Sequence, residues 1–142
     1  MARVHARAYI CGADLTPEEA KEKLLGTNPG FLVQTMRAES VKNEFVVEML
    51  AAQTFQAQAS GSLLAKKPEI DLLLRVAGTT QISSAIKKHG ARARERFLAV
   101  VAGDSAVQSP RAFSPLELPR NSLNRSELAR VECAALLNTL KG

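Results

Sequence analysis

The spacing of apolar and polar residues predicts a chain in which strands and helices intermix. Alternating or continuous apolar residues are typical of strands, and such segments lie at residues 3–11, 31–36 and 97–102. Apolar residues at helical spacing begin at or near residues 17, 41, 70, 82 and 125. Because these elements do not repeat as regular βαβ units, we expect an α+β fold. Residues 1–142 then form a single compact domain, with a mixed or antiparallel sheet packed against several helices.

Capping patterns mark where two of the predicted helices begin. Thr16 is followed three residues later by Glu19, and Asn124 is followed in the same way by Glu127. Such pairs satisfy free N–H groups in the first turn of a helix. Gly26 is a plausible end for the first of these helices.

Four further segments predict which parts of the chain are buried and which form loops. The run at 97–102 contains no polar residue, which indicates an interior strand. The helix at 41–59 has a wide apolar stripe, which indicates burial on more than one side, by the domain's own core or by a partner. Residues 108–121 predict a loop with an extended piece around residues 116–118. In the last helix the residues expected to pack inward are Leu128, Val131, Ala135, Leu136, Leu137 and Leu140.

Composition narrows the class of protein. The chain is 46% hydrophobic and 23% charged, which is ordinary for a soluble globular protein. No apolar run approaches the roughly 18–20 residues that a membrane span needs. The first residues do not resemble a signal peptide. We therefore expect a cytoplasmic protein without a membrane partner.

The positive charge of the chain is local. Residues 66–96 hold eight Lys or Arg and three Asp or Glu, a net charge of +5, which equals the +5 of the whole chain. A basic field on an otherwise neutral body favours a polyanion as partner. The alternative is a solvated charged face beside an ordinary helix corner, and the charges alone do not separate the two.

Motifs for catalysis or metal binding are missing from the sequence. Neither His5 nor His89 has Cys, Asp or Glu at the spacing of metal ligands. The Gly78-Thr79-Thr80 segment lacks the Lys and second Gly of a phosphate-binding P-loop. We expect a protein that is not an enzyme, with no catalytic residues, metal, cofactor or small-molecule substrate. His89 is expected to be a structural residue at a helix end.

Residues 70–91 predict two helices joined at a Gly-Thr-Thr corner. Gly78 suits a C-terminal cap with positive φ, and Thr79 or Thr80 is expected to cap the next helix. Free N–H groups at the start of that helix favour an anion. Ile82, Ala85, Ile86 and His89 are expected to point inward. The residues expected to point outward are Ser83, Ser84, Lys87 and Lys88.

The same residues resemble a known family. The motif consists of Leu-Leu-x-Arg-x-Ala-Gly ending at Gly78, followed by Thr-x-Gln-Ile-x-x-Ala-Ile from Thr79 and by Gly90. This motif is similar to that of the small tRNA-binding subunit of the KEOPS complex, the PRPK-binding protein family, in its archaeal form. The motif match spans residues 69–91. The order of elements along most of the chain is also similar.

The resemblance implies a non-catalytic α+β subunit of a tRNA-modification complex. Such a subunit binds the kinase-like ATPase subunit and supports its ATPase activity. It also grips the single-stranded 3′ CCA end of tRNA. It thereby serves, indirectly, the subunit that transfers threonylcarbamoyl to the adenosine beside the anticodon.

Motif position implies the site residues. The CCA site would involve Arg75, Gly78, Thr79, Thr80, Gln81 and Ile82. The RNA backbone would be held by Lys87 and Lys88, with Lys66, Lys67 and Arg92 as further candidates. Arg75 has a second interpretation as a structural ion pair, and Ile82 as a core side chain.

The sequence leaves open how RNA bases would be held, which helix binds the partner protein, and whether RNA is bound at all. With five Phe, one Tyr and no Trp, the chain has little material for stacking bases, so RNA contacts would use charge, backbone groups and aliphatic surface. The partner face for the kinase-like subunit is either the helix at 41–59 or the C-terminal helix. The alternative function is a protein-interaction subunit without direct RNA binding; an enzyme whose groups converge on folding comes third.

Overall fold

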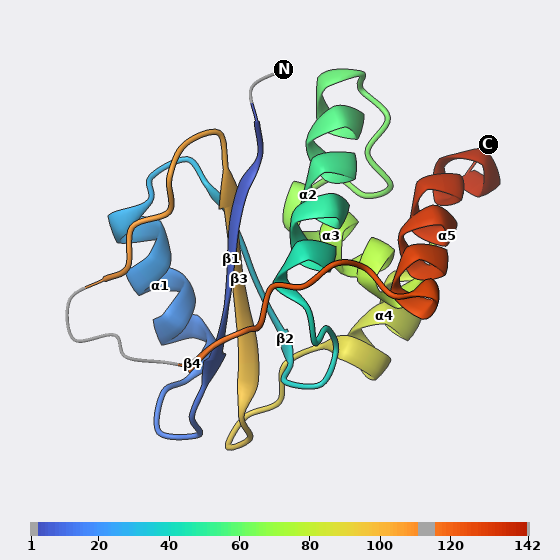
Figure 1. Cartoon of the computed structure of the whole chain (residues 1–142). Helices are drawn as coiled ribbons and strands as arrows, with labels where there is room; N and C mark the ends of the chain where they lie inside the picture. Colours follow the sequence, from blue (N-terminus) through green and yellow to red (C-terminus); the bar gives the residue numbers. More distant parts are fainter. Residues whose placement is uncertain (1–2, 111–115, 142) are drawn as a thin grey trace.

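The chain folds into one sheet with helices on both faces (Figure 1). The computed structural model describes residues 3–110 and 116–141. The strands are β1 (His5–Cys11), β2 (Leu32–Arg37), β3 (Phe97–Gly103) and β4 (Leu116–Glu117). The helices are α1 (Pro17–Thr27), α2 (Glu44–Ala59), α3 (Pro68–Ala77), α4 (Ile82–His89) and α5 (Arg125–Lys141). This arrangement confirms the predicted α+β fold.

Strand β3 forms the centre of the sheet, in which the strand order is β2-β3-β1-β4. β1 and β2 both pair antiparallel with β3, so they run in the same direction on its two sides. All seven residues of β3 are buried, which confirms the predicted interior strand. α1 covers one face of the sheet, and the other four helices lie on the opposite face (Figure 1).

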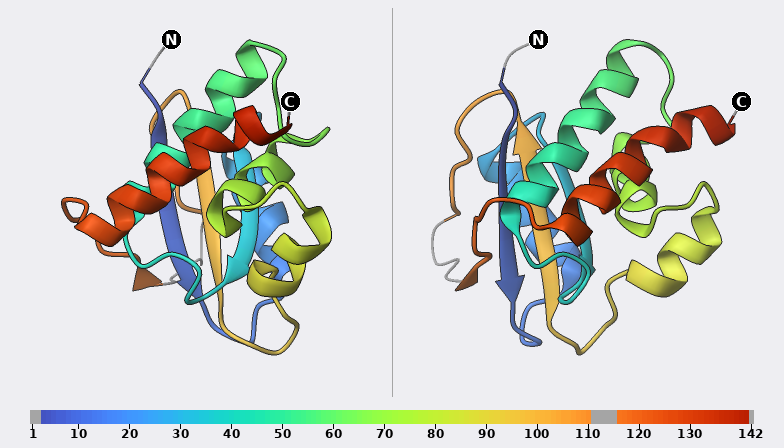
Figure 2. Two further views of the ribbon diagram at one scale, coloured as in Figure 1. Left: turned by 90° about the vertical axis from the view of Figure 1, so that its right-hand side faces the viewer. Right: turned by 45° about the vertical axis from the view of Figure 1, so that its right-hand side comes forward.

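The side chains of β3 alternate between two apolar clusters. Even-numbered residues such as Leu98 join the larger cluster, to which α2, α3 and α5 contribute. Odd-numbered residues such as Phe97 join a smaller cluster with Leu24 of α1. Figure 2 shows α5 as the outermost helix, lying across α2 and α3.

Both predicted capping boxes are present. The Thr16 hydroxyl accepts from the N–H of Glu19 (3.1 Å), and the Glu19 carboxylate accepts from the N–H of Thr16 (3.2 Å). Asn124 and Glu127 make the same reciprocal pair at the start of α5 (2.8 and 3.1 Å). α1 continues one residue past Gly26 and is capped by Asn28.

Helix α2 begins three residues later than its apolar pattern indicates. Asn43 caps it, since its Oδ1 accepts from the N–H of Phe45 (3.0 Å), so Val41 precedes the helix. Its wide stripe is buried mainly in the domain's own core, because Val46, Val47 and Leu50 belong to the larger cluster. β4 lies in the predicted extended piece, while residues 111–115 of the predicted loop lie outside the described part.

The predicted inward face of α4 is wrong for two residues. Ile82 and Ile86 are 46% and 51% exposed, and only Ala85 of this helix is buried. The reason is that α4 is short and packs mainly on α3, which Ala85 contacts as part of the core. His89 is half-buried at the helix end, where its Nδ1 lies 2.9 Å from the Ser40 hydroxyl, as a structural residue would.

The predicted inward face of α5 is also partly wrong. Val131, Ala134 and Leu137 are buried, while the other residues expected to pack inward are exposed: Leu128, Ala135, Leu136 and Leu140. As the outermost layer, α5 touches the body along one narrow strip only. No helix in the described residues is both long enough and apolar enough to cross a membrane.

Candidate nucleic-acid interface

The corner between α3 and α4 has the backbone geometry expected for Gly78. Its φ of 70° and ψ of 34° place it in the left-handed region, which L side chains rarely adopt. The N–H groups of Gly78 and Thr79 both donate to the carbonyl of Leu74 (2.8 and 3.2 Å). These two bonds close α3 and turn the chain sharply into α4.

The prediction that Thr79 or Thr80 caps α4 is wrong. Gln81, in an extended conformation, is the N-cap, and no side chain caps the helix. The Thr79 hydroxyl instead accepts from the N–H of Gln81 (3.1 Å), because α4 begins at Ile82, too far along the chain for Thr79 or Thr80 to reach its first turn. The first turn of α4 therefore offers backbone N–H groups that no side chain occupies.

An open groove of about 820 Å³ lies beside this corner. Its apolar lining includes Leu63, Ile70 and the exposed side chain of Ile82. Lys66 and Lys67 also line the groove, and both are exposed. An apolar channel with ammonium groups along it suits a ligand that combines flat apolar parts with negative charges.

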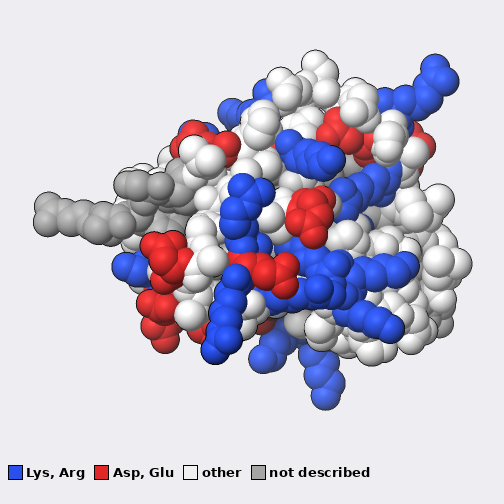
Figure 3. All heavy atoms as spheres, turned by 90° about the horizontal axis from the view of Figure 1, so that it is seen from below, with Lys and Arg blue, Asp and Glu red and all other residues white. Residues whose placement is uncertain are grey.

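A second concentration of positive charge lies on α4 and the segment that follows it. Lys and Arg outnumber Asp and Glu on the lower face of the molecule, with acidic side chains among them (Figure 3). The exposed cations of this segment are Lys87, Lys88, Arg92, Arg94 and Arg96. Within the described residues, none of the five takes part in an ion pair. Their charged groups are therefore available to phosphates, although Glu95 lies among them in the sequence.

Arg75 does not belong to this exposed charge. Its side chain is 1% exposed, and its Nε lies 2.7 Å from a carboxylate oxygen of Asp71. The terminal nitrogens donate to Asp71 (3.2 Å), to the Ala134 carbonyl (3.1 Å) and to Asn138 Oδ1 (2.9 Å). Asp71 also accepts from the Leu64 N–H and the Thr54 hydroxyl. The geometry supports the structural interpretation of Arg75, because its donors are engaged inside the fold.

The other residues assigned by motif position lie together at the surface. Gly78, Gln81, Ile82 and the two lysines of α4 are exposed, and Thr79 and Thr80 are partly so. Ile82 alone among them lines the groove. The structure thus brings the corner and the groove together and separates Arg75 from both.

Two further surface features lie outside the corner and the groove. One is the outer face of α5, where Leu128, Leu136 and Leu140 are 47%, 61% and 74% exposed. From the sequence this helix is a candidate partner face, but these leucines were expected to pack inward. The other is a hollow of about 530 Å³ lined by Phe31, Phe55 and Asp104 among others. Its only sequence signal is the Asn-Pro-Gly turn before Phe31, which does not reveal that Phe55 lies opposite.

Two further properties of the chain bear on its function: whether it could hold a metal ion, and whether its sequence matches known proteins. In the described residues no three His, Cys, Asp or Glu side chains are grouped so that they could hold a metal ion. No protein-family model matches the sequence, and no curated protein is significantly similar to it. The resemblance to the KEOPS subunit therefore rests on residues 69–91 and on the order of the elements.

Proposed function

We propose that the protein is a non-catalytic accessory subunit of the KEOPS type, which binds the single-stranded 3′ CCA end of tRNA. The observation that carries this proposal is the groove beside the Gly78 corner. An exposed Ile82 and two lysines line this groove together, which supports binding of a ligand that carries both bases and phosphates. Neither a metal nor a cofactor has a role in this proposal.

The residues divide the work as follows. Gly78, without a side chain, lets the RNA approach the backbone. The Thr79 and Thr80 hydroxyls and the Gln81 amide offer hydrogen bonds, and Ile82 gives apolar contact to a base. The exposed lysines and Arg92 supply a salt-dependent attraction to phosphates. Arg75 acts only indirectly, by holding α3 in place.

The kinase-like ATPase subunit would bind the outer face of α5. The apolar stripe of α2 is buried mainly in the core of the domain. Of its large apolar residues only Met49 is exposed, at 36%. α5, in contrast, presents three exposed leucines on one side of the helix. Through this contact the subunit would support ATPase activity and help present tRNA to the threonylcarbamoyl transferase subunit, in the cytoplasm.

A pair of isoleucines makes the test of the RNA site sharp. Binding of intact tRNA is compared with that of tRNA lacking its 3′ CCA, by fluorescence anisotropy. Ile82→Asp puts a carboxylate into the groove, and Ile86→Asp puts the same charge one turn away, on a similarly exposed side chain that does not line it. We expect CCA-dependent binding that Ile82→Asp weakens at least tenfold more than Ile86→Asp does. Equal effects of the two variants would contradict the assigned groove.

The second candidate is a protein-interaction subunit that does not bind RNA. The unpartnered leucines of α5 favour it independently of the basic surface. Absence of tRNA binding by the wild-type protein, together with binding of a kinase-like subunit that Leu136→Asp abolishes, would establish this alternative.

A further inference from the structure

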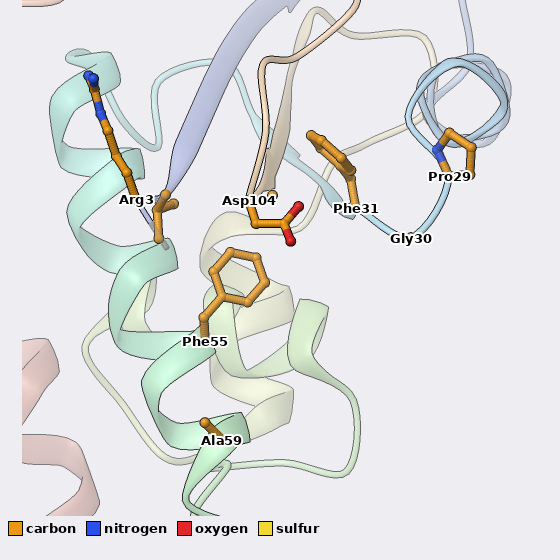
Figure 4. Close-up of a pocket in the computed structure, with 9 residues that line it drawn as sticks. Arg3, Pro29, Gly30, Phe31, Phe55, Ala59 and Asp104 are labelled. Carbon is orange, nitrogen blue, oxygen red and sulfur yellow. The ribbon is translucent and has the colours of Figure 1, made fainter. Parts of the chain in front are cut away.

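The hollow lined by Phe31 and Phe55 has the chemistry of a nucleobase pocket. It lies where the upper ends of the strands meet the C-terminal half of α2 (Figure 4). Both phenylalanines are partly exposed, so part of each side chain is accessible to a ligand. A volume of about 530 Å³ lies in the range of small-ligand sites.

The Phe31 ring is held firmly at the end of β3. A Cβ on Gly103 would lie only 2.6 Å from carbons of this ring, so the ring rests directly on the glycine backbone. Phe31 is thus pre-oriented before any ligand arrives, which lowers the entropic cost of binding.

Asp104 supplies the polar group of the hollow. Its carboxylate lies between the two rings in Figure 4, while the guanidinium of Arg3 points away from them. Among the described residues no hydrogen bond or ion pair engages Asp104. An unoccupied carboxylate offers acceptors only, so it selects ligands with N–H groups at the edge of a flat ring.

A third depression links the hollow with the groove of the candidate RNA site. This depression, beside β2, shares Gly30, Phe31 and Phe55 with the hollow and Gln58 with the groove. A path therefore runs from Ile82, past the exposed lysines, to the two phenylalanines. This continuity favours an extended RNA strand over an isolated small molecule as the occupant.

We propose that the hollow binds one unpaired base of the RNA strand whose CCA end occupies the groove. One of the two rings stacks on the base, and Asp104 accepts from its edge. Guanine suits it best, because N1–H and the N2 amino group donate together to the two oxygens of one carboxylate. This inference rests on the proposed RNA-binding function and extends its site by at least one nucleotide.

A conservative substitution with a matched control tests the stacking. Phe55→Leu keeps an apolar side chain but removes the ring face. Phe45→Leu makes the same change on the same helix, at a ring that Arg120 covers at 4.9 Å. The probes are intact tRNA, tRNA lacking CCA, and single-stranded RNA hexamers that end in CCA and carry G or U at their three 5′ positions. Loss of one stacking partner is expected to weaken hexamer binding roughly 5- to 100-fold, with no effect of Phe45→Leu.

Asp104→Asn gives a second readout that does not disturb the packing. Wild-type protein should prefer the G hexamer to the U hexamer, and the variant should lose that preference because its amide replaces one acceptor by a donor. Suppose that tRNA binding depends on CCA, but that neither Phe55→Leu nor Asp104→Asn changes binding of the hexamers. This result overturns the base pocket and leaves the proposed function in place. If tRNA lacking CCA binds as tightly as intact tRNA, and Phe55→Leu weakens the binding of both, the proposed function is overturned and the pocket is retained. Absence of RNA binding altogether overturns both.

Discussion

The helices α3 and α4 are neighbours in sequence and share one motif, yet they use their residues in opposite ways. In α3 most side chains are buried, including both members of the Asp71–Arg75 pair. In α4 only Ala85 is buried, and its two lysines face solvent. Arg75 and Lys87 carry the same charge, but one is neutralised inside the fold and the other is free to act outside it. The comparison teaches that one basic motif can combine a buried structural half with an exposed, positively charged half.

The largest effect on folding free energy is expected from breaking the buried Asp71–Arg75 ion pair of α3. Arg75→Met leaves the carboxylate of Asp71 buried without its ion-pair partner. Such a loss typically costs about 3–5 kcal/mol of folding free energy. Urea unfolding followed by circular dichroism measures it.

The double variant Asp71→Leu with Arg75→Met is the control for this prediction. Removing both charges leaves apolar groups in place of the pair, so part of the lost stability should return. The remainder is the cost of leaving the Leu64 N–H and the Thr54 hydroxyl without their acceptor. A double variant no more stable than the single one would show that the surrounding acceptors, and not Asp71, dominate the energy of this site.

Breaking the exposed half should affect binding and leave stability nearly unchanged. Lys87→Glu with Lys88→Glu is expected to weaken tRNA binding roughly 10- to 100-fold at moderate salt, and to make the dependence on salt less steep. Unfolding free energy should change by less than about 0.5 kcal/mol. Anisotropy titrations at several salt concentrations give both quantities.

Lys23→Glu with Arg125→Glu reverses the same number of charges at exposed positions outside the α3–α4 motif, and Lys23 lies on α1, across the sheet from it (Figure 1). If this control weakened binding as much as the double variant in α4, only net charge would matter. The assignment of Lys87 and Lys88 to the RNA interface would then fail.

The sharp turn between α3 and α4 depends on the backbone conformation of Gly78, which a substitution can test. A Cβ there meets no atom within 4 Å, but φ is +70°, so Gly78→Ala should cost about 1–2 kcal/mol through backbone strain alone. Gly26→Ala provides a control of opposite sign. Gly26 lies within α1 with open space around it, so alanine should stabilise the helix by about 0.5–1 kcal/mol.

The smallest effect concerns pH at the end of α4. Burial, and then the charges of Arg130 and Lys88, lower the pKa of His89 below its usual 6.5. The folded protein therefore resists a proton that the unfolded chain accepts. Stability should be complete above pH 6.5 and decline as the pH falls through the lowered pKa of the folded state. Urea unfolding at pH 7.5 and 5.5 should show a smaller difference for His89→Gln.

The sequence predicted the elements well where local physics determines them. The capping boxes at Thr16 and Asn124 and the unbroken apolar run of β3 depend on neighbours in the chain, and all three are present in the structure. A positive φ at Gly78 belongs to the same class. Such features do not require knowledge of what lies across the fold.

Burial was predicted less well, because an apolar stripe does not reveal what covers it. Ile82 in α4 and Leu136 in α5 follow helical spacing, but in the described part of the chain both side chains are exposed. The ion pair of Arg75 was visible as an acid four residues earlier, at Asp71. The approach of Phe31 to Phe55 depends on tertiary packing and has no comparable sign in the sequence.

The position of β3 has a consequence for how the chain acquires its shape during synthesis. β1 and β2 do not pair with each other, and each depends on β3, which ends at residue 103. A ribosome-bound chain that has emerged only to α4 thus holds two strands with no partner between them. We expect such nascent chains to remain sensitive to protease until β3 emerges, and the sheet then to form in a late step limited by long-range contacts.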